Sequence, residues 1–104
     1  MKKVVGQKLY NTDTAALLHE WDNGAGFTDF SYRSKDLYVT PKGAFFIHHH
    51  GGETSDMSRP VGNRGWVGGE DIMPITRREA IRFLELYGGT EVLLQRFPED
   101  ITEG

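Results

Sequence analysis

The chain contains no cysteine. This excludes thiolate zinc sites, thiol nucleophiles and a disulfide framework, and it is typical of proteins that fold in a reducing compartment. Long apolar runs are missing as well, because the basic pair at the N-terminus is followed by only two valines before Gly6 and Gln7. Such a run is too short for a secretory signal or a membrane span. We therefore expect a cytoplasmic protein that does not associate with membranes.

An excess of positive charge is also missing. Lys and Arg together number 12 and Asp and Glu 15, which gives a formal net charge of −3. This is the wrong sign for a protein whose whole surface binds phosphates, so no direct contact with nucleic acid is expected. A local basic patch remains open, since Arg59 and Arg64 share one loop and three arginines begin a predicted helix: Arg77, Arg78 and Arg82.

The length and composition indicate one globular domain over residues 1–104. Of the 104 residues, 38% are hydrophobic and 26% are charged, as in ordinary folded domains. A chain of this size buries roughly 65% of the surface that its unfolded form exposes, which is enough to fold without a metal or a disulfide. We expect no cofactor.

The N-terminal part predicts a strand and then a helix. Residues 4–10 begin with β-branched valines and predict a first strand. Residues 11–24 predict a short helix, because polar N-cap candidates precede apolar residues at helical spacing and Asn23-Gly24 follows. The apolar side of this helix consists of Leu17, Leu18 and Trp21, whereas His19 and Glu20 are expected in solvent.

A β-hairpin is predicted around Pro41-Lys42-Gly43. Proline presets a negative φ, and glycine can take the left-handed position of a three-residue loop. This loop pairs Thr40 with Ala44. Counting outward gives the register of the two strands: Val39 opposite Phe45, Tyr38 opposite Phe46, Leu37 opposite Ile47, and Asp36 opposite His48.

The two sides of this hairpin differ in character, because successive side chains of a strand point to opposite faces. The expected core side carries Leu37, Val39, Phe45 and Ile47. The expected outer side carries Tyr38, Thr40, Ala44, Phe46, His48 and His50.

The three consecutive histidines cannot act as one cluster on an extended strand. His49 points to the core side, whereas His48 and His50 share the outer side about 7 Å apart. Asp36 lies across the ladder and can supply an oxygen ligand. A structural zinc ion needs four ligands and a catalytic one three, so this set is incomplete and ordinary strand-end imidazoles are favoured. A metal site formed by His48, His50 and Asp36 is the alternative.

Residues 51–69 contain six glycines. A segment of this kind is usually a binding surface, or it hides a strand that the pattern does not reveal. Trp66 within it either closes the core or anchors a partner.

The C-terminal third predicts a strand and helices. Residues 70–75 are expected to form a last short strand, which Pro74 either confines to a sheet edge or prevents from pairing further. Thr76 and Glu79 form a capping box at the start of a helix that Gly88-Gly89 ends. The expected inner side of this helix is Ala80, Ile81, Leu84 and Tyr87. Residues 90–97 add a further turn or two of helix that packs Leu93, Leu94 and Phe97.

No catalytic constellation is found in the sequence. The serines lie in no nucleophile elbow, and the carboxylates near the histidines, Asp36 and Glu53, lack a paired acid and base at defined spacing. We expect a protein that is not an enzyme, with a metal-dependent activity as the alternative.

A series of short motifs resembles a family of small proteins encoded on bacterial conjugative elements and phages. The series runs in the order "LYNTDTA", "HEWDNG", "DFSYRSKDLYVTPKGAFFI" and "GGEDIMPITRREA" and covers most of residues 8–86. The histidine triplet is not part of the family's pattern. The resemblance implies a small accessory protein of a mobile element and supplies no activity. Small acidic proteins of such elements often counter host defence by binding, including as CRISPR inhibitors.

Together these observations predict an α+β fold, in which a three- or four-stranded, mainly antiparallel sheet carries helices on one face. The expected function is noncatalytic binding to a protein partner, with a CRISPR effector or another host defence complex favoured. In this anti-CRISPR-like interpretation, Glu20, Asp22, Asp29 and Asp36 imitate a row of phosphates. The other expected contact residues are Tyr38, Phe46, His48, His50, Arg59, Arg64 and Trp66. Besides the metal site, the remaining alternative is a homodimer or larger oligomer that forms through Tyr38 and Phe46.

Overall fold

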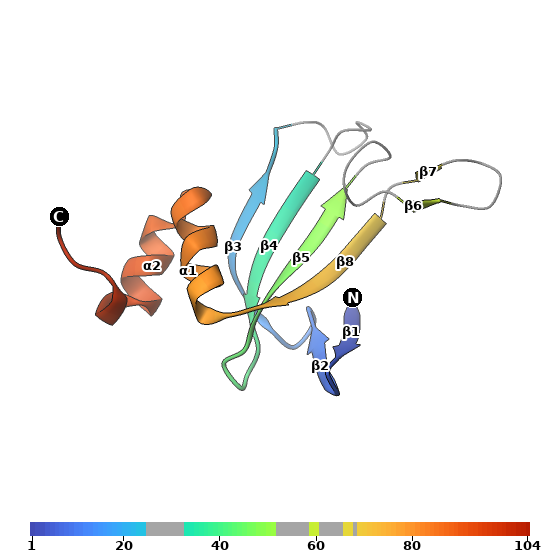
Figure 1. Ribbon diagram of the computed structural model, residues 1–104, viewed down its shortest axis with the longest axis horizontal. Coiled ribbons are helices and arrows are strands. Elements are labelled where there is room, and N and C mark those ends of the chain that lie inside the picture. Colours follow the sequence, from blue (N-terminus) through green and yellow to red (C-terminus); the bar gives the residue numbers. More distant parts are fainter. Residues whose placement is uncertain (25–32, 52–58, 61–65, 68) are drawn as a thin grey trace.

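The computed structural model describes residues 1–24, 33–51, 59–60, 66–67 and 69–104. Its centre is a four-stranded antiparallel sheet with the strand order β3-β4-β5-β8 (Figure 1). These strands are β3 (Ala16–Asp22), β4 (Arg33–Val39), β5 (Phe45–Gly51) and β8 (Gly69–Ile75). The sheet and the helices that follow it confirm the predicted α+β class.

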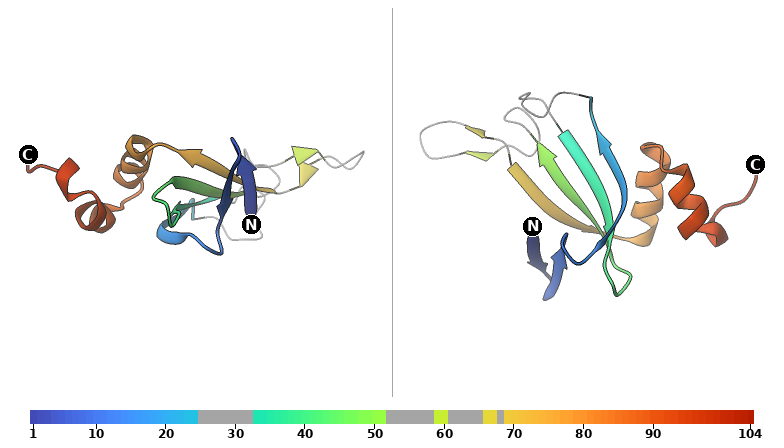
Figure 2. Two further views of the ribbon diagram at one scale, coloured as in Figure 1. Left: turned by 90° about the horizontal axis from the view of Figure 1, so that it is seen from below. Right: turned by 180° about the vertical axis from the view of Figure 1, so that it is seen from behind.

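Two small hairpins and two helices complete the described structure. One hairpin consists of β1 (Lys2–Val5) and β2 (Lys8–Asn11), the other of β6 (Arg59–Pro60) and β7 (Trp66–Val67). The helices are α1 (Arg77–Leu86) and α2 (Thr90–Arg96), followed by a 3-10 turn at Pro98–Asp100. Figure 2 shows the helices at one end of the sheet and the β6–β7 hairpin beyond the other end.

The β4–β5 hairpin has the predicted register. Val39 lies opposite Phe45, and Asp36 lies opposite His48. Gly43 adopts the left-handed conformation with φ of 86°, and the Thr40 backbone N–H donates to the Ala44 carbonyl at 2.8 Å. The loop chemistry of Pro41-Lys42-Gly43 was therefore sufficient to set the pairing of the two central strands.

The helices cover the face of the sheet that was predicted to form the core. Leu37 and Ile47 of the sheet pack in one buried cluster with helical side chains, namely Ala80, Phe83, Leu84, Leu93 and Phe97. The predicted capping box is confirmed, since Thr76 Oγ1 accepts from the Glu79 N–H and Glu79 Oε1 accepts from the Thr76 N–H. Leu94, predicted to pack, is 52% exposed instead, because it lies on the side of α2 that faces away from the cluster.

The predicted N-terminal strand is divided into two strands, and the predicted helix is wrong. Residues 4–10 are not one strand, because Gly6 and Gln7 both take left-handed conformations and reverse the chain between β1 and β2. Residues 11–24 are not a helix but contain β3, whose backbone pairs with β4. A bulge at Leu18 shifts the register between Leu17 and His19, which disturbs the alternation and leaves apolar residues at helix-like spacing. Pairing with β4 outweighs the local helical preference.

The second face of the sheet is partly covered, which corrects the prediction for Phe46. This side chain is fully buried, in a cluster with Tyr10 of β2 and Ile72 of β8. Tyr10 approaches the Phe46 ring edge-on at 5.7 Å, and Tyr38 stacks on it at 5.1 Å. The β1–β2 hairpin thus supplies a cover that the two-strand pattern could not reveal.

Pro74 lies in β8, which is an edge strand as predicted. Among the residues that the structure describes, neither helix has the length and apolar character needed to cross a membrane.

Candidate functional site

Six polar residues share the part of the second face that lies beyond Phe46. Cross-strand pairing aligns Glu20, Asp36 and His48 in one row across β3, β4 and β5. The next row contains Asp22, Ser34, His50 and Glu70, from β3, β4, β5 and β8. Directly paired residues of neighbouring strands lie on the same face. We call the set Glu20, Asp22, Asp36, His48, His50 and Glu70 the polar face.

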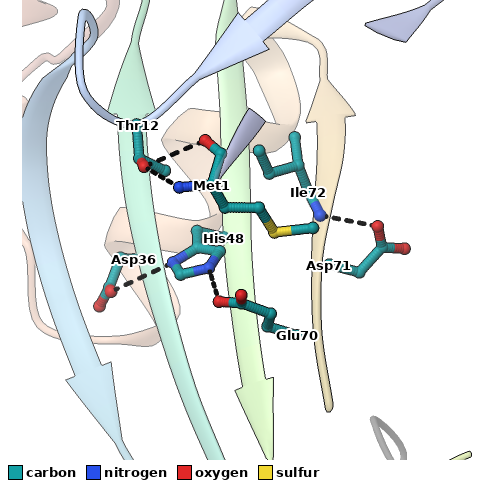
Figure 3. Close-up of polar contacts among 7 residues, drawn as sticks. All are labelled: Met1, Thr12, Asp36, His48, Glu70, Asp71 and Ile72. Atoms are coloured by element: carbon teal, nitrogen blue, oxygen red, sulfur yellow. Dashed lines mark hydrogen bonds and ion pairs between the residues drawn. The ribbon is translucent and has the colours of Figure 1, made fainter. Parts of the chain in front are cut away.

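His48 lies between two carboxylates at the centre of the polar face (Figure 3). Its Nε2 atom is 2.8 Å from Glu70 Oε2, and its Nδ1 atom is 4.0 Å from Asp36 Oδ2. The His48 side chain is 18% exposed, compared with 25% for Asp36 and 47% for Glu70. Because the carboxylates come from β4 and β8, which flank β5, the sheet itself places one acidic group beside each ring nitrogen.

Negative charge is disfavoured at Asp36. Burial raises the pKa of its carboxyl above the ordinary value, and the nearby Glu20 carboxylate raises it further. His48 and His50 act in the opposite direction but do not cancel these effects. Burial, followed by the charges of Asp36, Glu20 and Asp13, also raises the pKa of Tyr38. The polar face therefore holds the Asp36 carboxyl in a position that opposes its ionisation.

The geometry gives the metal-binding alternative no support. In the part of the chain that the structure describes, no three His, Asp or Glu side chains are placed so that they could hold an ion. The Nε2 atom of His48 faces Glu70, and Nδ1 faces Asp36 on the other side of the ring.

The other predicted contact residues are not members of the polar face. Arg59 and Trp66 lie in the β6–β7 hairpin, where Arg59 pairs with Val67 and Trp66 with Pro60. Asp29 and Arg64 lie outside the described residues. Tyr38 borders the polar face and stacks on the buried Phe46.

Glu70 is the member of the polar face that sequence reasoning missed. It was assigned to the last strand, but nothing in the pattern placed that strand beside β5. In the structure β8 pairs with β5, so Glu70 lies opposite His50 and reaches His48 diagonally. The only signal in the sequence was the edge-strand character of residues 70–75, which does not identify a neighbour.

The predicted basic patch on α1 is partly neutralised. The Arg77 guanidinium contacts Glu99 at 2.9 Å and Asp100 at 2.5 Å, and it lies over the Phe97 ring. Arg77 therefore fastens the C-terminal turn to the first turn of α1.

Comparison of the chain with protein-family models, with curated proteins and with solved structures finds no match. The resemblance to proteins of conjugative elements and phages stays a prediction.

Proposed function

We propose that the protein is a noncatalytic, cytoplasmic binding protein whose polar face docks on a positively charged surface of a partner protein. The carrying observation is the alignment of four carboxylates from three strands: Glu20, Asp22, Asp36 and Glu70. Asp36 is held half-buried although burial opposes its charge. Such unfavourable placement is common at functional sites, where it is retained for the interaction that it makes.

The partner that fits this surface has a basic channel that normally holds nucleic acid. Glu20 and Asp36 lie on neighbouring strands about 4.8 Å apart, and Asp22 and Glu70 lie on the two outer strands, so a rigid sheet presents four negative charges at fixed positions, as a phosphate backbone does. An acidic protein of this kind competes with nucleic acid for the channel. Together with the resemblance to mobile-element proteins, this supports a CRISPR effector or another host defence complex as the target, and inhibition as the effect.

The test is a charge-reversed variant with a control of equal net charge. Glu20→Lys, Asp22→Lys and Glu70→Lys are combined in one protein, because all three residues are exposed. The control combines Glu85→Lys, Glu91→Lys and Glu103→Lys, which are also exposed and lie in the helices and the C-terminal tail. Two quantities are measured: the affinity for purified CRISPR effector–guide complexes, and the ability to prevent these complexes from binding target DNA.

The polar-face variant is expected to bind at least about 100-fold more weakly, since each reversed charge turns attraction into repulsion. The control is expected to keep most of the affinity, and wild-type binding is expected to weaken with salt. If the polar-face variant binds as tightly as the wild type, the proposed surface is wrong. If both variants lose affinity equally, net charge and not this face is responsible.

The structure gives the oligomer alternative no surface of the predicted kind. That alternative requires Phe46 and Tyr38 side by side in solvent, whereas Phe46 is fully buried beneath the β1–β2 hairpin.

A further inference from the structure

A pocket of about 530 Å³ lies between two chain reversals, the β1–β2 turn and the β4–β5 loop. Figure 1 shows both reversals at the lower edge of the molecule. The first contributes Gln7, Lys8 and Tyr10 to the lining, and the second contributes Pro41, Lys42 and Ala44. This volume lies within the range of roughly 300–1,000 Å³ that is typical of sites for small ligands. We call this hollow the two-turn pocket.

The two-turn pocket is locally positive in a chain of net charge −3. Lys8 and Lys42 contribute its charged side chains, and they come from positions 34 residues apart in the sequence. Neither ammonium group forms an ion pair with any carboxylate in the described ranges. Two ammonium groups on one hollow, without a carboxylate to neutralise them, favour a bound anion.

The walls of the pocket are fixed by contacts that do not depend on a ligand. Tyr10 is 8% exposed and packs edge-on against the buried Phe46 ring. Thr40 Oγ1 accepts from the Ala44 N–H at 3.0 Å, and the Thr40 carbonyl accepts from the Gly43 N–H at 2.9 Å. A preformed site loses little conformational entropy on binding. Tyr10, Pro41 and Ala44 give it an apolar side beside the two charges.

Gln7 provides an independent observation. With φ of 66°, it is the only residue other than glycine in the described part of the chain that has a positive φ. Glycine or asparagine is favoured at the second position of such a two-residue turn. The left-handed conformation costs other residues roughly 1–2 kcal/mol of conformational free energy. Backbone strain of this kind is concentrated at ligand-binding positions. Gln7 lines the pocket, so a residue in a strained backbone conformation forms part of its wall.

We propose that the two-turn pocket binds a small anion in which a carboxylate or phosphate is attached to a flat apolar group. Lys8 and Lys42 bind the anionic end from the two sides of the pocket. The Gln7 amide donates a hydrogen bond to the same end. The apolar group packs on Tyr10 and Pro41. This site is separate from the polar face, so it does not depend on the proposed partner binding.

The first experiment titrates the full chain with benzoate, phenyl phosphate, inorganic phosphate and benzyl alcohol. Binding is followed by calorimetry and by the NMR shifts of the backbone amides of Gln7, Lys42 and Ala44. Benzoate or phenyl phosphate is expected to bind and to shift these amides, and the tighter of the two identifies the anionic group. Benzyl alcohol, which lacks the charge, and inorganic phosphate, which lacks the ring, are expected to bind at least about tenfold more weakly.

Variants then assign the binding to the pocket. Lys8→Gln and Lys42→Gln are each expected to lower the affinity for the preferred anion about tenfold, because each removes one charged contact. Lys2→Gln is the matched control, since Lys2 is an exposed lysine of β1 outside the lining. Gln7→Gly is expected to weaken binding several-fold while the melting temperature stays equal or rises, because glycine relieves the left-handed strain.

Three results would overturn the proposal. One is that neither aromatic anion binds the wild-type protein. Another is that Lys8→Gln and Lys42→Gln bind the preferred anion as tightly as the control variant Lys2→Gln does. The third is that benzyl alcohol or inorganic phosphate binds as tightly as the preferred aromatic anion.

Discussion

Asp36 lies at the centre of β4, half-buried, with the Glu20 carboxylate on the neighbouring strand. Burial and Glu20 raise its pKa, so the folded protein binds a proton at this carboxyl more readily than the unfolded chain does. Stability therefore falls as the pH rises from the unfolded pKa through the folded pKa, and the full penalty is present at neutral pH. The ionised Asp36 carboxylate therefore destabilises the fold at neutral pH, where the proposed function requires its charge.

The first prediction follows from the direction of the pKa shift of Asp36. Asp36→Asn is expected to raise the melting temperature at pH 7 by about 3 °C, which corresponds to roughly 0.5 kcal/mol for a domain of this size. The gain is expected to shrink as the pH falls and the wild-type carboxyl becomes protonated. Calorimetric melting at pH 7 and pH 4 checks both statements. A lower melting temperature of the variant at pH 7 would show that the ionised carboxylate stabilises the fold instead.

The local structure was predicted best from the sequence at positions where a few adjacent residues determine it. Pro41-Lys42-Gly43 set the register of β4 and β5, and Thr76 with Glu79 set the start of α1. In the β1–β2 turn, by contrast, Gly6 suits the left-handed backbone but Gln7 has no preference for it, so local chemistry gave only a weak signal for this reversal.

Prediction failed where distant segments decide the structure. Phe46 is buried by a hairpin that precedes it by more than 30 residues. The alternation of residues in β5 alone is equally consistent with an exposed side chain at this position. The contact between His48 and Glu70 joins residues 22 positions apart and depends on which strand becomes the neighbour of β5. The centre of the polar face was therefore predictable from the β4–β5 hairpin, whereas its border with β8 was not.

At the scale of the element, β8 is an edge strand whose outer side is occupied by side chains. Asp71 Oδ1 accepts from the Lys3 ammonium at 2.7 Å and from the Ile72 N–H at 2.8 Å. The Lys3 ammonium also donates to the Ile72 carbonyl at 3.4 Å. Pro74 has no N–H to offer. These features leave little of the β8 edge open to pairing with another strand, which is a common protection against aggregation.

The second prediction concerns this ion pair. The Lys3 hydrogen bond lowers the pKa of Asp71, so its stabilisation is present above the unfolded pKa and is lost as the pH falls through the folded pKa. Because both side chains are about half exposed, Asp71→Asn is expected to lower the free energy of unfolding by only about 0.2–1 kcal/mol at pH 7. Urea unfolding at pH 7 and near pH 3 measures the difference.

A double-variant cycle supplies the control for this pair. Lys3→Gln is expected to produce a similar loss, and the combination with Asp71→Asn should cost less than the sum of the two single losses. Additive losses, or a loss from Asp71→Asn that does not change with pH, would contradict a direct pair between these residues.

At the scale of the whole molecule, one sheet separates two apolar clusters. Leu37 and Ile47 pack against the helices, whereas Phe46 and Ile72 pack beneath Tyr10 of the β1–β2 hairpin. Phe46 and Ile47 are adjacent in β5, so the same backbone supports both clusters. The polar face lies on the strands of this sheet, whereas the two-turn pocket is lined by the β1–β2 hairpin and by the loop that joins β4 to β5.

The third prediction is that the two clusters unfold together. Phe46→Ala and Phe97→Ala form a matched pair, since each removes a fully buried phenyl ring from one side of the sheet. Each is expected to cost about 3–5 kcal/mol, a large part of the stability of a small domain. In a urea titration, the NMR signals of Tyr10 in the hairpin and Leu84 in α1 should disappear with the same midpoint in both variants. If Phe46→Ala releases the hairpin while the Leu84 signal keeps its wild-type midpoint, the clusters are independent, and the hairpin is then an attachment to a sheet that the helices alone stabilise.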